Sequence, residues 1–400
     1  MSVRSGLDVL AGGKAGQLNG KKVGLVTNQT GIDRKFRRTA QVLHEAGATV
    51  CAMFGPEHGY YGVEQDAIAL TGEERDRWNN VAVYSLYRAE DLNQPDDKET
   101  NPFGPPPGSL DGLDALVFDI QDVGVRYYTY PTTLGILLEQ VNIPVYVIDR
   151  PNPLGGTLVE GPGLEAPFSS FVGRYPGIPV RHGLTIGELA LYINRHILHN
   201  RAEVTVIQME GWRREMAWEE TGLPWVATSP NLPTLTTARL YPGTCLVEGT
   251  NLSLGRGTTQ PFELVGAPWI TDPDELAAAL NRLERPGIYF RPTFFKPIYF
   301  PYKEEVCGGV QIHILPDVSA LGPEQMVRSG LLLVATLFRL YSEKFKWLPA
   351  HFDRLIGSAK PRLQLEKAEG NATSLQHLFD QWEDDEQGFK SQIDDVLLYK

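Results

Sequence analysis

Two side chains that can transfer protons stand together in the segment FGPEHGYYG, residues 54–62. Glu57 and His58 lie between two glycines, and Pro56 restricts the backbone just before them. A carboxyl group on such a turn is either a solvated loop side chain or a general acid. Because a strand-like run precedes the turn, the catalytic interpretation becomes as strong as the solvated one. His58 has two equally balanced interpretations, a partner in the reaction or a structural histidine.

A second acid follows another strand-like run, in FDIQDVGVRYYTY, where Asp119 ends the run and Asp122 comes next. If Asp122 lay close to Glu57, repulsion between the two charges would keep a proton on one of them. A general acid needs such a proton. We therefore expect Asp122 to be the second carboxyl group of a site.

Several other side chains suit the binding of a sugar-sized ligand. Arg126 and Tyr128 stand in an aromatic run with Tyr127 and Tyr130, and aromatic rings can pack on apolar sugar faces. The alternative for each tyrosine is core packing. Further candidates are polar side chains at strand ends or among glycines: Asn28, Asp149, Arg150, Asn152, Glu248, Asn251 and Arg256. For Asp149 and Arg150, the alternative is an ion pair that only holds its loop.

The elements that would position these residues alternate between strand and helix patterns. Apolar runs occur in KKVGLVTNQTG, TVCAMFGPEHG, DALVFDIQDVG and IPVYVIDRPNP, and PTTLGILLEQVN and RRTAQVLHEAGA have helical spacing. Such alternation predicts an α/β fold with a doubly wound parallel sheet. Ligands bind beyond the carboxyl ends of the strands in such sheets, and four of the predicted strands end in polar residues there.

The second half of the chain has a different pattern. A boundary is expected within residues 227–243, followed by a helix at DPDELAAALNRLE. YFRPTFFKPIYFPY and GGVQIHIL predict strands, and PEQMVRSGLLLVATLFRLY predicts a long amphipathic helix.

Composition excludes several classes of partner and cofactor. The net charge of −12 disfavours nucleic acid and anionic lipid as the main partner. No G-x-G-x-x-G follows the first predicted strand, no histidine or cysteine spacing fits a metal, and G-x-S-x-G is absent. We expect no cofactor and no metal, and a small molecule as the substrate.

Cys51, Cys245 and Cys307 are expected to be buried free thiols because their spacing fits no metal site. No apolar run is long enough to span a bilayer. The first residues lack an apolar signal region, so we expect a cytoplasmic protein, or a periplasmic or secreted one if a signal was removed.

Six motifs, in order, resemble the exo-β-N-acetylmuramidase family called NamZ, formerly a family of unknown function. They are GLVTNQTG, FGPEHG, DIQDVGVRYYTY, DRPNPLGG, SPNLPT and EGTNLSLGRGTTQPFE. The resemblance covers most of the chain and is strongest from about residue 20 to 265. It implies a Rossmann-like domain over residues 1–235, a smaller α/β domain over residues 236–400 and a cleft between them. It adds Asn231, in SPNLPT, to the expected binding residues.

The resemblance also implies an activity, the removal of N-acetylmuramic acid from the non-reducing end of peptidoglycan fragments. Glu57 would be the general acid. Asp122 would be base, nucleophile or orienter. If the 2-acetamido group of the substrate assists the reaction, Asp122 would only orient that group. The rival interpretation is a non-catalytic sensor that binds a muropeptide or sugar in the same cleft.

One position departs from the family pattern. Typical members continue the GPEHG motif with an aliphatic residue and Arg, and this chain has Tyr60 and Tyr61 instead. Another cation must then meet the lactyl carboxylate of N-acetylmuramic acid. The candidates are Arg126, Arg150 and Arg256. We favour Arg256, because it lies between two glycines on a loop rich in polar groups.

Overall fold

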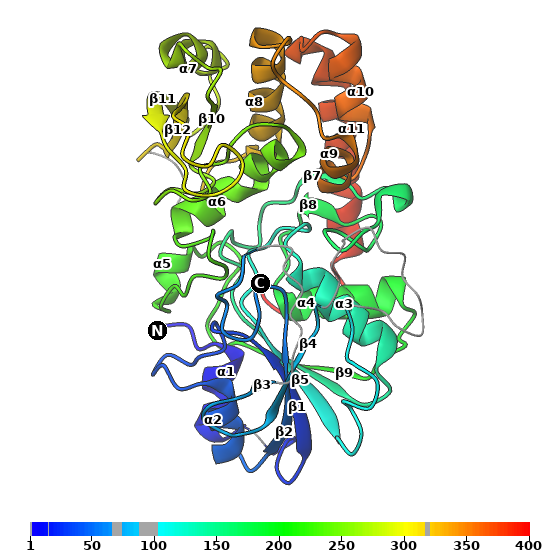
Figure 1. The fold of residues 1–400 in the computed structure, drawn as a ribbon. Helices are drawn as coiled ribbons and strands as arrows, with labels where there is room; N and C mark the ends of the chain where they lie inside the picture. Colours follow the sequence, from blue (N-terminus) through cyan, green and yellow to red (C-terminus); the bar gives the residue numbers. More distant parts are fainter. Residues whose placement is uncertain (1, 15, 66–73, 88–102, 317–320) are drawn as a thin grey trace.

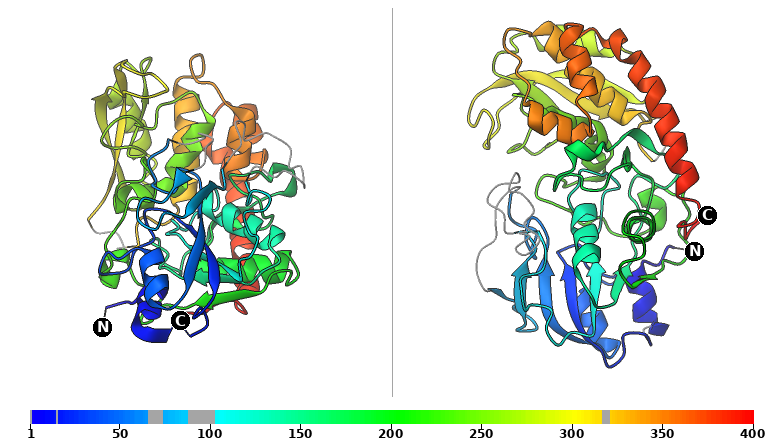
Figure 2. Two further views of the ribbon diagram at one scale, coloured as in Figure 1. Left: turned by 60° about the horizontal axis from the view of Figure 1, so that its bottom comes forward. Right: turned by 90° about the vertical axis from the view of Figure 1, so that its right-hand side faces the viewer.

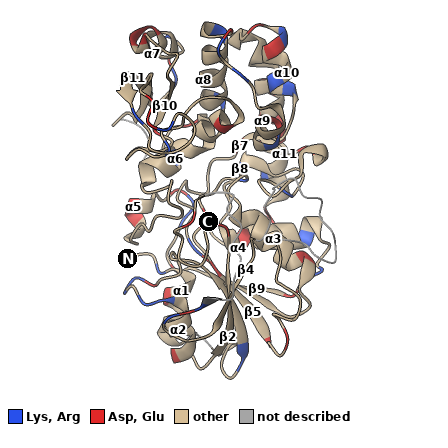
Figure 3. Ribbon diagram, in the orientation of Figure 1, with Lys and Arg blue, Asp and Glu red and all other residues tan. Residues whose placement is uncertain are grey.

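The computed structural model describes residues 2–14, 16–65, 74–87, 103–316 and 321–400. A large sheet with its helices forms the lower half in Figure 1, and a smaller sheet with a group of helices forms the upper half. Basic and acidic positions, blue and red on the ribbon, occur in both halves (Figure 3).

The large sheet has seven strands, in the spatial order β3-β4-β2-β1-β5-β6-β9. The strands are β1 (Lys22–Thr27), β2 (Thr49–Gly55), β3 (Glu74–Arg75), β4 (Ala82–Ser85), β5 (Ala115–Asp119), β6 (Val145–Ile148) and β9 (Val204–Ile207). All neighbours pair in parallel except β3, which is antiparallel to β4 at the edge. The six parallel strands follow the 3-2-1-4-5-6 order of doubly wound dinucleotide-binding folds. The predicted fold class is confirmed.

Helices cover both faces of this sheet because each central strand is apolar on both sides. Successive side chains of a strand point to opposite faces. Leu116 and Phe118 of β5 belong to the core cluster that includes residues of α3 and α4, whereas Ala115 and Val117 belong to the cluster that includes residues of α1 and α2. These helices are α1 (Gly6–Val9), α2 (Thr39–Glu45), α3 (Tyr130–Gln140) and α4 (Ile186–Tyr192).

Two expected helix starts are confirmed. Pro131 lies in the first turn of α3, where its missing N–H has no partner to lose. Thr185 and Glu188 form the expected capping box at the start of α4.

The upper half contains an antiparallel sheet in the order β10-β12-β11. Its strands are β10 (Leu264–Ala267), β11 (Ile288–Phe295) and β12 (Cys307–Ile314). The expected strand over YFRPTFFKPIYFPY ends at Phe295, because Pro297 and Pro301 have no N–H to donate to a ladder. The predicted amphipathic helix is present as α8 (Met326–Leu340).

The remaining helices and a short hairpin complete the chain. The helices are α5 (Trp218–Thr221), α6 (Leu235–Thr244), α7 (Pro273–Asn281), α9 (Pro349–Ile356), α10 (Lys360–Lys367) and α11 (Gln376–Gln392), and the hairpin is β7 (Glu160–Gly163) with β8 (Pro179–Arg181). Helix α11 runs from the upper half toward the lower half (Figure 2, right). The chain end then packs on the large sheet, where the Tyr399 hydroxyl donates to Asp149 at 2.6 Å.

The structure tests what was expected of the cysteines and of membrane-spanning segments. All three cysteines are free thiols, but Cys51 is exposed, because the first three residues of β2 lie at an uncovered end of the strand. Among the described residues, no helix is both long and apolar enough to cross a membrane. The cytoplasmic location and the domain division at residue 235 stay predictions.

Candidate active site

The turn that carries Glu57 directly follows β2. The Gly59 N–H donates to the Pro56 carbonyl at 2.9 Å, and His58 has the left-handed φ of 68°. A Cβ added to Gly55 would lie 2.7 Å from the Tyr60 nitrogen, so only glycine lets the chain fold back this tightly. The turn therefore fixes Glu57 and His58 at the carboxyl edge of the sheet.

The Glu57 side chain is held from the other side by α3. The Thr129 hydroxyl, at the residue before α3, donates to Glu57 Oε2 at 2.6 Å. Glu57 is only 8% exposed, so this contact is shielded from bulk water. A hydrogen bond to a fixed hydroxyl sets the direction in which the carboxyl group faces.

His58 is oriented by the backbone. Its Nδ1 lies 2.9 Å from the Glu64 carbonyl oxygen, which can only accept a hydrogen bond. Nδ1 therefore carries a proton, and in the neutral ring the lone pair is on Nε2.

Glu57 and His58 line a pocket whose other walls come from residues both before and after residue 236. Six of the predicted site residues line it: Glu57, His58, Tyr128, Asn231, Glu248 and Arg256. Tyr128 is held there because its hydroxyl donates to Thr228 Oγ1 at 2.9 Å. Burial raises the pKa of Tyr128, so its hydroxyl keeps its proton and can donate.

A charged cluster forms the pocket wall contributed by the second half of the chain. Arg256 Nη2 donates to Glu248 Oε1, and His351 Nε2 lies 3.5 Å from the other Glu248 oxygen. The Arg256 guanidinium carbon lies 5.3 Å from the centre of the Phe262 ring, in cation–π contact. His351 is not among the residues predicted from the sequence, since a lone histidine in PAHFD, at the start of α9, gives no signal of a site.

Asn28 supports the pocket without lining it. Its amide donates to the Tyr130 hydroxyl at 3.0 Å, and that hydroxyl donates to the Thr228 carbonyl at 2.9 Å. The neighbouring Gln29 amide donates to the Ala227 carbonyl at 2.8 Å. These bonds tie the end of β1 to the segment that carries Asn231.

Asp122 lies at the same edge of the sheet but does not line the pocket. Its Oδ2 accepts from the Gly124 N–H at 2.6 Å, and burial raises its pKa to about 7. His182 Nε2 lies 3.9 Å from Asp122 Oδ2. Burial lowers the pKa of His182 to about 3, so the imidazole is neutral and the contact is not an ion pair.

Three predicted binding residues instead hold the loop after β6. Asp149 accepts from the Thr185 and Tyr399 hydroxyls at 2.8 and 2.6 Å and is fully buried. Arg150 forms a two-bond pair with Asp119, at 2.5 and 2.8 Å. The Asn152 amide donates to the Leu184 carbonyl at 3.0 Å. Asp149 and Arg150 thus hold the loop, as their alternative interpretation expects, although the ion pair of Arg150 is with Asp119. None of the three residues lines the pocket.

The side chains of Arg126 and Asn251 also donate hydrogen bonds to backbone carbonyls. Arg126 donates to the carbonyls of Pro162, Ile178 and Leu355 at 3.1, 2.9 and 2.8 Å, and burial lowers its pKa to about 10. The Asn251 amide donates to the Lys344 carbonyl at 2.9 Å. Of the three arginines considered for carboxylate binding, Arg256 is the one that lines the pocket.

Comparison with known proteins identifies the family. The family model described as exo-β-N-acetylmuramidase NamZ, N-terminal, matches residues 23–236, and its C-terminal counterpart matches residues 239–399. The chain belongs to the NamZ family. It is 40% identical over 402 residues to the peptidoglycan beta-N-acetylmuramidase NamZ of Bacillus subtilis (strain 168), and the match covers 99% of this chain and 91% of that protein.

Two solved structures share the fold. Both are crystal structures of DUF1343 family proteins from Bacteroides fragilis NCTC 9343, and each match covers 100% of this chain and 99% of that chain. The TM-scores are 0.86 and 0.75, at 33% and 28% sequence identity.

Tyr60 and Tyr61, at the departure from the NamZ pattern, do not line the pocket. Tyr60 is buried in the core cluster that includes α2, and the Tyr61 ring packs edge-on against it, with 4.9 Å between centroids. The two rings therefore pack on the side of the turn that faces away from the pocket.

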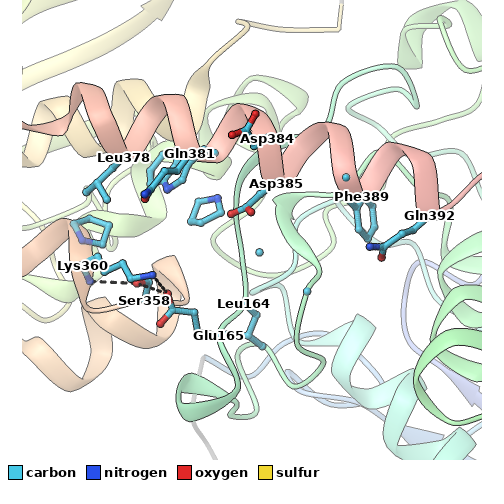
Figure 4. Close-up of a pocket in the computed structure, with 16 residues that line it drawn as sticks. Leu164, Glu165, Ser358, Lys360, Leu378, Gln381, Asp384, Asp385, Phe389 and Gln392 are labelled. Atoms are coloured by element: carbon cyan, nitrogen blue, oxygen red, sulfur yellow. Dashed lines mark hydrogen bonds and ion pairs between the residues drawn. The ribbon is translucent and has the colours of Figure 1, made fainter.

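A second hollow, of about 460 Å³, lies between α11, the start of α10 and residues 162–165 (Figure 4). Its Glu165 carboxylate already accepts from Ser358 at 3.1 Å and pairs with Lys360 at 2.8 Å. Arg126 lies between this hollow and the pocket. It donates hydrogen bonds to the carbonyl of Pro162, which lines the hollow, and to the carbonyl of Leu355, which lines the pocket. The pocket lined by Glu57 and His58 at the sheet edge is the candidate active site.

Proposed function

We propose that this protein is a glycoside hydrolase that releases N-acetylmuramic acid from the non-reducing ends of peptidoglycan fragments. The observation that carries the proposal is the Glu57 carboxyl group, fixed on a glycine-flanked turn and facing a pocket with a charged cluster on its other wall. The activity named for the Bacillus subtilis relative supports the choice of substrate.

Glu57 would act as the general acid. In this role it gives its proton to the oxygen between the two sugars as the bond to the anomeric carbon breaks. The departing sugar then leaves as a neutral alcohol. Thr129 is the positioning residue, because its hydroxyl orients the carboxyl group.

The second chemical group is best supplied by the substrate. The other described carboxylate that lines the pocket, Glu248, is paired with Arg256, and Asp122 is buried outside the lining. The 2-acetamido oxygen of the sugar can attack the anomeric carbon and form a cyclic oxazolinium ion. Water then opens this ion, and Glu57, now a carboxylate, accepts the water proton.

Recognition of the lactyl carboxylate would fall to the charged cluster of Arg256, Glu248 and His351. Without substrate, the Glu248 carboxylate balances the Arg256 guanidinium. His351 Nε2, 3.5 Å from Glu248 Oε2, gives Glu248 a second polar neighbour beside Arg256. The Arg256 fork can then turn to the substrate carboxylate and bind it.

A release assay tests the activity. The protein is incubated with a chromogenic β-N-acetylmuramide and with the matching β-N-acetylglucosaminide. We expect chromophore release from the muramide at a clearly higher kcat/KM. Tight binding of muramic acid-containing fragments without any release would favour the sensor interpretation instead.

A further inference from the structure

The end of β11 and the loop between β11 and β12 carry a concentration of exposed apolar side chains. Twelve large apolar side chains are exposed among the described residues, and five of them fall within residues 294–306. These five are Phe294, Ile298, Tyr299, Phe300 and Val306. Exposed apolar residues on a soluble protein are usually scattered, so a cluster of this kind indicates a binding surface.

The central part of this loop, residues 298–300, packs on Gly257, the residue after the pocket-lining Arg256; we call it the rim segment. The Ile298 N–H donates to the Gly257 carbonyl at 3.0 Å. A Cβ added to Gly257 would lie 2.5 Å from the Tyr299 nitrogen, and Gly257 has a φ of 77°. Because Gly257 follows Arg256, the rim segment is joined to the loop that carries Arg256 into the pocket.

A second contact fixes the loop from its other side. The Tyr302 hydroxyl donates to the Asn251 carbonyl at 2.7 Å and accepts from the Trp269 indole at 3.2 Å. The loop backbone is thus anchored, whereas Ile298 and Phe300 keep 71% and 75% of their surfaces exposed. In the right-hand view of Figure 2, the yellow part of the chain projects from the upper half.

An enzyme that removes a terminal sugar holds that sugar in its pocket, so the remaining chain must pass over the pocket rim. Saccharide rings have apolar faces that pack on aromatic and aliphatic side chains, and a tyrosine hydroxyl can bond their oxygens. We propose that the rim segment binds the saccharide on the leaving side of the cleaved bond. This inference rests on the proposed function and extends it to longer fragments. Continuity with the pocket favours a saccharide over a lipid surface or a second copy of the chain.

The test uses the double variant Ile298→Ser/Phe300→Ser, which spares Tyr299 and its packing on Gly257. We compare kcat/KM for an aryl β-N-acetylmuramide, which has no leaving saccharide, with that for a tetrasaccharide that has muramic acid at its non-reducing end. Loss of these contacts should lower kcat/KM for the tetrasaccharide about tenfold and leave that for the aryl muramide unchanged. Ile298→Ser/Phe300→Tyr, which restores an aromatic ring, should recover most of the loss.

Tyr289→Ser is the matched control. Tyr289 is 48% exposed on β11, the strand that precedes the loop, and lies roughly 20 Å from the end of the strand where the loop begins. This variant should behave like the wild type on both substrates. Equal losses on both substrates in the double variant, or no loss on either, would overturn the proposal. So would a change in oligomeric state measured by light scattering, which would assign the rim segment to self-association.

Failure of the proposed function gives a different result. If the wild type cleaves neither substrate, the activity is wrong, and calorimetric titration with the tetrasaccharide then decides the role of the rim segment. Binding that weakens about tenfold in the double variant supports a saccharide surface. Binding that is absent, or equal in both proteins, overturns it.

Discussion

The Thr129 hydroxyl donates a 2.6 Å hydrogen bond to the Glu57 carboxylate and so joins the turn after β2 to the start of α3. The two residues are far apart in the sequence and belong to different crossovers of the sheet. The direction of the proposed general acid therefore depends on how α3 packs as well as on its own turn. This relationship makes Thr129 a positioning residue.

Replacement of Thr129 tests this role. Thr129→Val removes the hydroxyl at nearly constant volume, and we expect kcat to fall about ten- to a hundredfold, since a hydrogen bond to a charged group is worth about 1.5–3 kcal/mol. Thr129→Ser keeps the hydroxyl and should retain most of the activity. Initial rates on a muramyl disaccharide measure both variants. Equal losses in the valine and serine variants would contradict a hydrogen-bonding role.

Replacement of Arg256 tests carboxylate recognition. Arg256→Ala should lower kcat/KM for the β-N-acetylmuramide about ten- to a hundredfold, the expected loss for a charge-assisted contact. Activity on the glucosaminide, which has no carboxylate, should hardly change. Arg256→Lys keeps the charge but loses the planar fork of the guanidinium. Its kcat/KM for the muramide should lie between those of the wild type and Arg256→Ala.

His351→Gln tests the other side chain that contacts Glu248. We expect KM for the muramide to rise and KM for the glucosaminide to stay constant, because only the muramide brings a second anion beside Glu248. Steady-state kinetics on both substrates measure this difference. If the Arg256 or the His351 variant lost activity equally on both substrates, that residue would be assigned to structure or catalysis instead.

Substrate assistance predicts a dependence on the N-acyl group. Fluorine atoms on the acetyl group withdraw electrons from the carbonyl oxygen and weaken it as a nucleophile. A series of muramides from N-acetyl to N-trifluoroacetyl should show kcat/KM falling with each fluorine. A flat series would indicate that Glu248 or Asp122 supplies the second group.

The raised pKa of Asp122 predicts that the free energy of unfolding depends on pH. Burial raises its pKa from 3.8 to about 7 in the folded protein, so its contribution to folding is full below pH 3.8 and is lost as the pH rises toward 7. The loss amounts to up to about 4 kcal/mol. Asp122→Asn keeps the oxygen that accepts from Gly124 and has no charge to bury.

The comparison between the two proteins isolates this effect. The lowered pKa of His182 works in the opposite direction, with stability lost as the pH falls from 6.5 toward 3. Because wild type and Asp122→Asn both keep His182, its effect cancels in their difference. Urea denaturation should show the variant gaining stability relative to the wild type between pH 5 and pH 8. A constant difference would contradict the raised pKa.

The apolar strand patterns predicted the large sheet well, because both faces of its central strands are buried and the signal is local. The same reasoning placed Glu57 at the sheet edge beside a pocket. It could not separate pocket residues from loop supports, because both are polar groups at strand ends. Asp149 and Arg150 follow β6 as Glu57 follows β2, yet their partners, Thr185 and Asp119, hold them in the interior.

His351 and the rim segment show the other limit of the sequence. His351 reaches the charged cluster because α9 packs against the turn that contains Glu248, and no local pattern encodes such a contact. The rim segment was expected to be a strand, because its aromatic residues favour strands. The prolines on either side of it, Pro297 and Pro301, and its packing on Gly257 make it a loop instead.

The most direct test of the account is the activity of Glu57→Gln beside the wild type. The amide keeps the size of the side chain but cannot serve as an acid, and general acid–base catalysis is typically worth about 10²–10⁴-fold in rate. On a muramyl disaccharide, whose leaving group needs a proton, kcat should fall by that range, and on an aryl muramide with an acidic leaving group it should fall much less. A small and equal loss on both substrates would show that Glu57 is not the general acid.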